Sequence, residues 1–508
     1  MNNRFIRIFC LLLTVCILTV SLSLGESSMD ITTTVLDQFM ELTKIPRPSG
    51  HEESVSDYLK HWAEGRNFTV IQDSYHNIIF DVPASKGYEA LPLTALQCHM
   101  DMVFAQKEGL NLDPLTTVIS AVNDGTWLKT DGSTSLGADD GIGIALILCI
   151  ADGKADHGPL RLIITTDEET SMSGTNNMDP SLLTGVRYLI NVDSETEGEL
   201  CVSSACGDKA YFTKGFEAAH QSKEKTVQIR LHGLSGGHSG LEIGKNLLNA
   251  GMEMGSILNT ILNADIDFEL KSLKGGLADN AIMNSVTAVI CIDEADSVAL
   301  SAIIDSSREQ LKEAGSETDP ELKLDISDVT AEDDAVLPAS ERDAVLTFFR
   351  EYKNGVKTMS PSIPGLVESS SNLGIVEISP ESIRFAVMSR SSNADREAGQ
   401  LNEQQTLADK LEYNIEIINT GDAWDYKPDS KLERHFREAY QDLFGTGLSI
   451  VAVHAGLECG TYAKYNPDMD IVSVGPTVVD AHSVNEKLEI SSIRKVWDLL
   501  TTVLVQID

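Results

Sequence analysis

The feature that most constrains the fold of this chain is a series of short apolar segments that each end in a histidine or a carboxylate. PLTALQC precedes His99 and Asp101, LRLIITT precedes Asp167, Glu168 and Glu169, RYLINV precedes Asp193, and DIVSVG is followed by His482. Continuous apolar runs of this length are typical of strands buried on both faces of a parallel sheet. Because open α/β sheets bind ligands beyond the carboxyl ends of their strands, we expect these polar side chains to gather there.

Two styles of alternating elements predict two folded units, in keeping with a length of 508 residues. Up to about Val202, helical segments such as ESVSDYLKHWAEG alternate with strand segments, which indicates an α/β domain with a mostly parallel sheet. An α+β style begins near Asp208, and the first style resumes near Gly421. We therefore predict a first domain from residues 27–207 and 421–508, and an inserted α+β domain from residues 208–420.

The first 25 residues differ from the rest of the chain. Two arginines precede an uncharged apolar stretch from Ile8 to Gly25, which ends in small residues. This is the pattern of a signal peptide, so we expect residues 1–25 to direct the protein to a secreted or periplasmic location. An uncleaved anchor is one alternative, and translation from Met29 would instead give a cytoplasmic protein.

Charge and cysteine content restrict the function further. The formal net charge of −38 comes without a basic stripe, so nucleic acid is an unfavourable partner and small molecules are favoured. No stable membrane association is expected once the leader is cleaved. The remaining cysteines mostly lie in apolar runs without a CxxC motif, which predicts buried free thiols, and only Cys201 and Cys206 are close enough in sequence to form a pair.

The residue types at the strand ends favour metal chemistry. A single aspartate there is more often a helix cap, but two histidines and at least three carboxylates over five sites, including the turn before Asp140, are hard to explain as caps. A set of this kind without cysteine suits zinc, manganese or cobalt in a reactive site. Three ligand carboxylates and two divalent ions leave room for one hydroxide, so the charge balance favours two ions.

The spacing within two motifs supports this interpretation. His99 and Asp101 are two residues apart, so both lie on one face of an extended strand end, where Asp101 is placed to orient the imidazole. Glu168 and Glu169 point in different directions, which lets one bind metal while the other acts on water. Metal-assisted hydrolysis requires this division of roles.

Longer motifs resemble those of one enzyme family. CHMDMV, LGADDGIGIA, TTDEETSMSG, LINVDSETEGEL, GLSGGHSGLEIG, SSSNLG, HAGLECG and VSVGPTVVDAHS occur in this order between residues 30 and 508. Together they are similar to the M20 family of metallopeptidases, in its aminoacyl-histidine dipeptidase branch. The resemblance implies a di-metal peptidase domain, an inserted lid that also forms a homodimer, and two divalent ions, which we take as zinc with manganese or cobalt as alternatives.

The resemblance also implies roles for the strand-end residues. It makes His99 and Asp193 ligands of one metal, Glu169 and His482 ligands of the other, and Asp139 the carboxylate that bridges both. Glu168 then resembles the general base that takes a proton from the bridging water and passes it to the leaving amine. The peptide bond after the residue that matches Asp139 is commonly cis in the family.

Four further residues are implied as substrate contacts. His238 resembles the lid histidine that stabilises the oxyanion, often in the active site of the partner subunit, and Arg390 the arginine that clamps a C-terminal carboxylate. Asn280 is expected to assist at the carboxylate, and Glu458 to hold a free α-amino group. The simpler interpretations are that His238 is a surface-loop histidine, that Arg390 is an edge-strand arginine and that Asn280 is a turn cap. Asp279 also adds a negative charge where a substrate carboxylate would prefer a positive one.

These observations predict a metal-dependent dipeptidase that hydrolyses unblocked dipeptides of the Xaa-His, carnosine-like type and more broadly, by attack of a metal-bridging hydroxide. A small peptide is therefore the expected partner. Another M20 hydrolase, either a tripeptidase or an N-acyl-amino-acid deacylase, is the nearer alternative. A non-catalytic peptide-binding protein is the more distant one, and a complete ligand set with an intact Glu168 argues against it.

Overall fold

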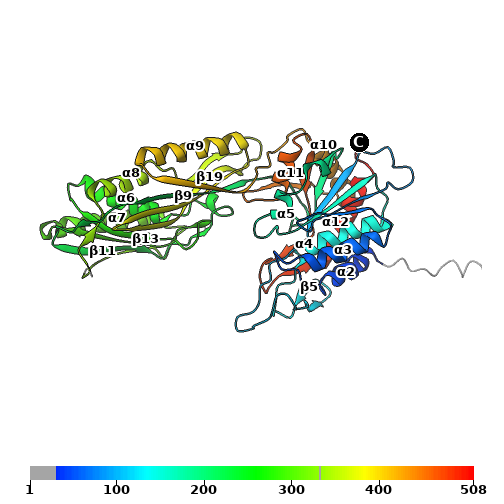
Figure 1. Cartoon of the computed structure of the whole chain (residues 1–508), viewed down its shortest axis with the longest axis horizontal. Helices are drawn as coiled ribbons and strands as arrows, with labels where there is room; N and C mark the ends of the chain where they lie inside the picture. The colour runs from blue at the N-terminus through cyan, green and yellow to red at the C-terminus, as the bar shows by residue number, and fades with distance from the viewer. Residues whose placement is uncertain (1–29, 331–332) are drawn as a thin grey trace, which may run out of the picture.

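The computed structural model of the protein describes residues 30–330 and 333–508, so the leader predicted for residues 1–25 lies outside the described residues. Figure 1 shows two lobes that meet over a narrow connection. One lobe contains an eight-stranded sheet and the other a nine-stranded sheet. We call them the first domain and the lid, and together they confirm the predicted α/β fold with an inserted α+β lid.

The sheet of the first domain has the strand order β1-β2-β6-β3-β7-β23-β8-β22. Its strands are β1 (Val70–Gln72), β2 (Ile78–Val82), β3 (Thr94–His99), β6 (Leu160–Thr165), β7 (Tyr188–Asn191), β8 (Glu199–Ser204), β22 (Ser449–Val453) and β23 (Asp470–Ser473). The pairs β3–β6, β3–β7, β7–β23 and β8–β22 are parallel, and β1 and β2 add an antiparallel edge. The carboxyl ends of β3, β6 and β7 therefore lie side by side.

Helices cover both faces of this sheet, which explains why its central strands are mostly apolar. They are α2 (Ile31–Leu42), α3 (Glu53–Glu64), α4 (Ala138–Cys149), α5 (Ser173–Asn176), α10 (Lys431–Phe444), α11 (Cys459–Tyr465) and α12 (Ile490–Leu504). Leu96 and Cys98 of β3 pack in the core formed with α2, α4 and α12, whereas Ala95 packs on the opposite face with Tyr462 of α11. Alternate residues of one buried strand thus serve two cores.

The lid is built on an antiparallel sheet with the order β16-β11-β15-β13-β19-β20-β9-β21, with β18 paired to β19. Its strands are β9 (Cys206–Gly215), β11 (Lys225–His232), β13 (Glu269–Gly275), β15 (Val286–Ile292), β16 (Lys323–Asp328), β18 (Gly355–Met359), β19 (Val367–Ser379), β20 (Ser382–Ser391) and β21 (Asn414–Gly421). Its helices are α6 (Ala250–Asn263), α7 (Ser297–Ala314), α8 (Ala339–Glu351) and α9 (Ala394–Leu411). The lid has its own core, in which Phe348 of α8 stacks on Phe385 of β20.

Several features differ from the sequence prediction or were not foreseen. The segment between β3 and α4 contains the hairpin β4 (Ala121–Asn123) and β5 (Trp127–Thr130). Its strand β5 pairs with β25 (Lys487–Glu489), which in turn pairs with β24 (Val478–Val479). The serine-rich SSSNLG motif lies in the long strand β19, because pairing on both sides outweighs its low β-propensity.

The prediction of buried free thiols agrees with the structure. All six cysteines of the described residues are buried and free, including Cys201 and Cys206. Within residues 30–330 and 333–508, no helix combines the length and apolar character needed to cross a membrane.

Candidate metal centre and active site

The predicted metal ligands form two clusters that share one carboxylate. His99 Nε2 lies 3.1 Å from Asp139 Oδ1 and 3.5 Å from Asp193 Oδ1. On the other side, His482 Nε2 lies 3.0 Å from Asp139 Oδ2 and 2.8 Å from Glu169 Oε1. The two oxygens of Asp139 thus face one cluster each, and the ligand atoms of each cluster lie within 4.8 Å of one another.

The buried carboxylate of Asp101 connects two loops of the site. Its Oδ1 lies 3.3 Å from His99 Nδ1 and accepts a hydrogen bond from the backbone N–H of Glu168 (3.1 Å). Its Oδ2 accepts from the backbone N–H of Glu169 (3.3 Å). Asp101 therefore orients the His99 ring and fixes the turn that carries both glutamates.

The carboxylate of Glu486 supports the turn before Asp139 through hydrogen bonds to its backbone. This buried carboxylate accepts hydrogen bonds from four successive backbone N–H groups at 2.8, 3.0, 2.7 and 3.4 Å, those of Leu136, Gly137, Ala138 and Asp139. Gly137 has φ +69°, and a Cβ there would lie 2.6 Å from Met102 Sδ, so this position requires glycine. The peptide bond between Asp139 and Asp140 is cis, as the sequence resemblance implies.

A buried arginine joins the same turn to the end of β3. The Arg47 guanidinium donates to the carbonyls of Met100 (2.8 Å), Asp101 (2.9 Å) and Gly137 (2.5 Å). It is 2% exposed, and within the described residues its hydrogen bonds go to carbonyl oxygens, while the nearby carboxylates of Asp101 and Glu486 act on it through their charge. Arg47 and Glu486 thus lock together the segments that place His99 and Asp139.

The electrostatics of the clusters call for positive charge. Contacts with Asp139 and Glu169 raise the pKa of His482 to about 11. Burial lowers the pKa of His99, but Asp193 and the other carboxylates around it raise the pKa well above its usual value. This field favours positive charge at the two histidines, which a bound cation would supply.

Glu168 lies beside these clusters without being part of either. Burial raises the pKa of its carboxyl group well above the usual value, and the neighbouring carboxylates of Asp193 and Glu458 add to this rise against the opposing effect of His99. A carboxyl group with a raised pKa next to a candidate metal pair is the setting in which proton transfer is effective.

Glu458 does not occupy the position expected of it. Its side chain is fully buried, and its oxygens accept hydrogen bonds from Gln97 (2.5 Å), from Thr165 (2.9 Å) and from the Thr175 hydroxyl. Neither oxygen is exposed to meet a substrate amine in this structure. The motif HAGLECG shows that a glutamate follows β22, but it does not show that the side chain turns inward, toward Gln97 and Thr165 of the sheet.

The lid residues form a separate group. The pairing of β12 (Gly237–His238) with β14 (Ala281–Ile282) places His238 next to Asn280, whose carbonyl accepts from the backbone N–H of Ser239. Arg390 is 6% exposed, and its Nε is a buried donor without a hydrogen-bond partner among the described residues. Besides burial, the charges that affect the pKa of His238 are those of Arg390 and Glu242, not those of the metal clusters.

Sequence reasoning missed Arg47, Glu486 and Glu195. Glu195 follows Asp193 by two residues and is exposed, and its carbonyl accepts from the backbone N–H of Val478, in the segment that leads to His482. Desolvation by the surrounding protein, with the charge of Asp139, raises its pKa to about 8. Its i, i+2 spacing from Asp193 was the available signal, whereas Arg47 and Glu486 lie far from the clusters in sequence.

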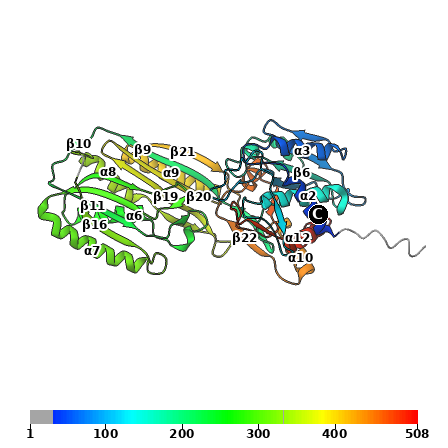
Figure 2. The ribbon, with the colours of Figure 1, turned by 90° about the horizontal axis from the view of Figure 1, so that it is seen from below.

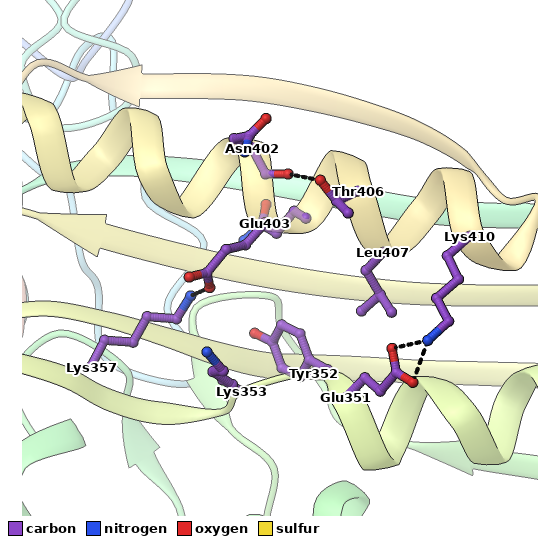
Figure 3. Close-up of a pocket in the computed structure, with 10 residues that line it drawn as sticks. Glu351, Tyr352, Lys353, Lys357, Asn402, Glu403, Thr406, Leu407 and Lys410 are labelled. Atoms are coloured by element: carbon purple, nitrogen blue, oxygen red, sulfur yellow. Dashed lines mark hydrogen bonds and ion pairs between the residues drawn. The ribbon is translucent and has the colours of Figure 1, made fainter.

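A hollow in the lid, shown in Figure 3, lies apart from these clusters. It has a volume of about 280 Å³ and lies between α8 and α9, with Tyr352 and Leu407 in its wall. Its cationic side chains are largely neutralised, because Lys357 pairs with Glu403 at 2.8 Å and Lys410 with Glu351 at 2.6 Å. We therefore place the candidate active site at the strand ends.

The clusters fit a pair of divalent cations. Each contributes one imidazole nitrogen and carboxylate oxygens, and no thiolate takes part among the described residues. Glu169 Oε1 is buried and accepts no well-aligned hydrogen bond within the described part of the chain, although it lies 2.8 Å from His482 Nε2. A buried carboxylate oxygen that faces an imidazole nitrogen in this way suits a cation shared by the two side chains. Paired clusters of this composition at the strand ends of an α/β sheet define a metal-dependent hydrolase.

Comparisons with known proteins identify the family. A profile of Peptidase family M20/M25/M40 matches residues 95–506. The cytosol non-specific dipeptidase of Escherichia coli (strain K12) is 35% identical over 485 residues, which cover 93% of this chain and 97% of that protein. The chain therefore belongs to the M20/M25/M40 peptidases and is a hydrolase of peptide bonds.

Solved structures agree. The aminoacylhistidine dipeptidase from Vibrio alginolyticus matches with a TM-score of 0.87 and 29% identity, over 96% of this chain and 99% of that one. The aminopeptidase PepT from Bacillus cereus matches with a TM-score of 0.53 and 14% identity over 93% of this chain, which shows the fold alone.

Proposed function

We propose that this protein is a di-metal dipeptidase that hydrolyses unblocked dipeptides, including Xaa-His dipeptides of the carnosine type. The observation that carries the proposal is the pair of clusters that share Asp139, with Glu168 beside them. Likeness over nearly the full length to two proteins named as dipeptidases supports the substrate class.

His99, Asp139 and Asp193 would hold one cation, and Asp139, Glu169 and His482 the other, with zinc as the proposed metal and manganese or cobalt as alternatives. When bound, such a pair polarises the scissile carbonyl and lowers the pKa of water. Asp101 keeps His99 Nδ1 engaged, so that Nε2 faces the first cluster. This hydrogen bond also fixes the orientation of the ring.

Glu168 would act as the general base. Its carboxylate takes a proton from the attacking water and then donates that proton to the nitrogen of the leaving amine. Asp101 fixes the backbone of Glu168, and the surrounding carboxylates favour its protonated form between these two steps. A peptide-binding protein without activity would have no use for this arrangement.

The lid would bind the other end of the substrate. Arg390 has a buried guanidinium with an unpartnered Nε, which suits a C-terminal carboxylate, and Asn280 lies beside His238 as a further donor. His238 Nδ1 accepts from the backbone N–H of Gly240 (3.2 Å), so the ring proton lies at Nε2, where it can stabilise an oxyanion. Because the charges that act on His238 are those of Arg390 and Glu242 and not those of its own metal clusters, we propose that it acts across a homodimer.

The experiment that tests this function is hydrolysis of a small panel by metal-stripped protein, before and after addition of zinc, manganese or cobalt. The panel contains β-Ala-His, Gly-His, Leu-Gly, an N-acetylated dipeptide, a C-terminally amidated dipeptide and a tripeptide. We expect no turnover without metal and restored cleavage of the unblocked dipeptides alone. The amide tests whether a free carboxylate is needed at Arg390.

Other outcomes would change the assignment. Cleavage of the acetylated dipeptide identifies a deacylase, and preference for the tripeptide identifies a tripeptidase. A protein that binds the dipeptides but cleaves none of them with any metal contradicts the proposed function.

Glu195, rather than Glu458, is the carboxylate we propose for the substrate α-amino group, because it is exposed beside Asp193 and lacks an ion-pair partner in the part of the chain that the structure describes. Glu195→Gln is expected to raise KM for unblocked dipeptides by about tenfold, with a smaller change in kcat, since a charged hydrogen bond contributes about 1.5 kcal/mol or more. Steady-state kinetics measure this effect. The matched variant Glu199→Gln, four residues further on, should leave KM unchanged, and equal effects of the two substitutions would contradict the assignment.

Export by the predicted leader is also a proposal, and its support is the sequence of residues 1–25 alone. The relative from Escherichia coli is named for the cytosol, which corresponds to the alternative start at Met29.

A further inference from the structure

A serine of the SSSNLG motif lies next to Arg390 in the sheet of the lid. Ser370 of β19 is directly opposite Arg390 of β20, and Gly207 of β9 is opposite Arg390 on its other side. Side chains at directly paired positions leave the same face of a sheet, so Ser370 and Arg390 are neighbours on one face. Gly207, which also pairs with Gly421 of β21, adds no side chain to this face, where a Cβ would lie 3.8 Å from Arg390 Nη1. Figure 2 shows β19 and β20 in the lid and β22 across the connection between the lobes.

The first domain contributes a histidine to the same face. His454 directly follows β22, and its Nε2 lies 2.7 Å from Ser370 Oγ. The histidine is 7% exposed and the serine 1%. The loop that carries His238 also packs here, because a Cβ at Gly240 would lie 2.5 Å from the His454 carbonyl oxygen and 3.0 Å from His238 Cε1. We call Ser370, Arg390 and His454 the arginine cluster.

The arginine cluster holds a buried positive charge without a counter-ion. Within residues 30–330 and 333–508, Arg390 forms no ion pair, and its Nε makes no hydrogen bond. The carboxylate whose charge acts on Arg390 is that of Asp279, which is already bound to Lys209 Nζ (3.3 Å) and to the Tyr211 hydroxyl (3.0 Å). Because a buried guanidinium without partners is costly, this geometry calls for an anion beside it.

The ring of His454 provides a second, independent observation. Its Nδ1 is buried and makes no well-aligned hydrogen bond within the part of the chain that the structure describes. Burial and the charge of Arg390 lower the pKa of His454 to about 3, against the effect of the Val367 carbonyl, so the ring is neutral and has one N–H. In the Nε2–H tautomer, the ring donates to Ser370 Oγ, and the hydroxyl proton of the serine is left for another acceptor. An anion beside Arg390 is such an acceptor and therefore favours this tautomer.

We propose that Ser370 donates a hydrogen bond to the C-terminal carboxylate of the substrate beside Arg390, and that His454 is the positioning residue that holds this hydroxyl. The inference rests on the proposed dipeptidase function and adds two residues to the substrate contacts given above. Ser370 would determine specificity, because a hydroxyl and a guanidinium together favour an anion over a neutral amide. His454 belongs to the first domain, so both domains would take part in recognising one group of the substrate.

Binding of a dipeptide and of its amide tests the proposal without turnover. Zinc-loaded, full-length Glu168→Gln protein is titrated with Gly-His and with Gly-histidinamide in a calorimeter. We expect the ratio of the two affinities, which measures recognition of the carboxylate, to fall about tenfold when Ser370→Ala is added. The matched control is Ser371→Ala, at the next serine of the motif, whose hydroxyl lies on the opposite face, 2.6 Å from that of Tyr352. It should leave the ratio unchanged.

Steady-state kinetics test the role of His454. In the otherwise wild-type enzyme, Ser370→Ala should raise KM for Gly-His about tenfold and change kcat by less than about twofold. His454→Leu should raise KM by a similar factor, whereas His454→Gln, whose amide is able to donate to Ser370 Oγ, should recover most of the loss. Since the two residues act through one hydrogen bond, the double variant Ser370→Ala, His454→Leu should be no worse than either single variant.

Three results would overturn the proposal. They are an affinity ratio that Ser370→Ala leaves unchanged, equal effects of Ser370→Ala and Ser371→Ala, and a wild-type protein that binds the dipeptide and its amide equally tightly. Additive effects of Ser370→Ala and His454→Leu on KM would contradict the positioning role of His454. Failure of the dipeptidase assignment has a different sign, because no dipeptide would then be cleaved with any metal, while the affinity ratio still reports contact of Ser370 with the carboxylate.

Discussion

Glu168→Gln should lower kcat for unblocked dipeptides by about 10² to 10⁴-fold while leaving two metal ions bound at the shared clusters. The amide cannot accept the proton of water, but it keeps the shape of the side chain. The backbone N–H of residue 168 still donates to Asp101, so the turn that carries Glu169 stays in place. Steady-state kinetics and metal analysis of the same preparation measure the two quantities, and the loss corresponds to at least about 3 kcal/mol of transition-state stabilisation.

The control for this variant is Glu53→Gln, the same substitution at an exposed position of α3, which should turn over at the wild-type rate. Loss of metal together with activity in Glu168→Gln would make Glu168 a ligand rather than a base. Unchanged turnover with metal bound would exclude the mechanism.

Glu486→Leu should have the largest effect on stability. The substitution leaves four buried backbone N–H groups around Gly137 without an acceptor, at a cost of about 3 kcal/mol or more. Because this turn places Asp139 between the clusters, we also expect metal affinity or activity to fall by about 10 to 100-fold. Thermal unfolding and competition with a chelator measure these effects.

Glu486→Gln retains one side-chain oxygen as acceptor and should fall between wild type and Glu486→Leu in both measurements. Glu309→Leu on the lid, where the glutamate side chain is 78% exposed, is the control for a surface substitution and should leave metal affinity unchanged. A Glu486→Leu protein with wild-type melting temperature and metal affinity would show that Glu486 does not support the site.

The sequence predicts the strand ends of the first domain well, for a simple physical reason. A buried parallel strand is mostly apolar, so a histidine or carboxylate at its end marks the edge of the sheet. His99 is the last residue of such a strand, Glu169, Asp193 and His482 follow such strands, and the structure brings the four into two clusters around Asp139. For these residues, the sequence pattern of the strands is enough to predict their position in the fold.

The supporting residues could not be predicted in the same way. Arg47 and Glu486 are about 90 and 350 residues from Gly137, which both of them contact. Their own neighbours in sequence carry no sign of this role, because their partners are backbone atoms brought together by the fold. Glu458 shows the converse, since its motif identifies a glutamate near the site but leaves the direction of the side chain open.

The position of Gly207 beside Gly421 has a consequence for how such a chain can change over time. The inserted residues begin and end at neighbouring positions, so the lid is a single long insertion in an otherwise continuous domain. Both strands that border it belong to the sheet of the lid, and the first domain keeps its own separate core. A change in the length or sequence of this insertion, or its loss, therefore leaves the metal-binding domain connected. The two parts of the chain are able to evolve at different rates.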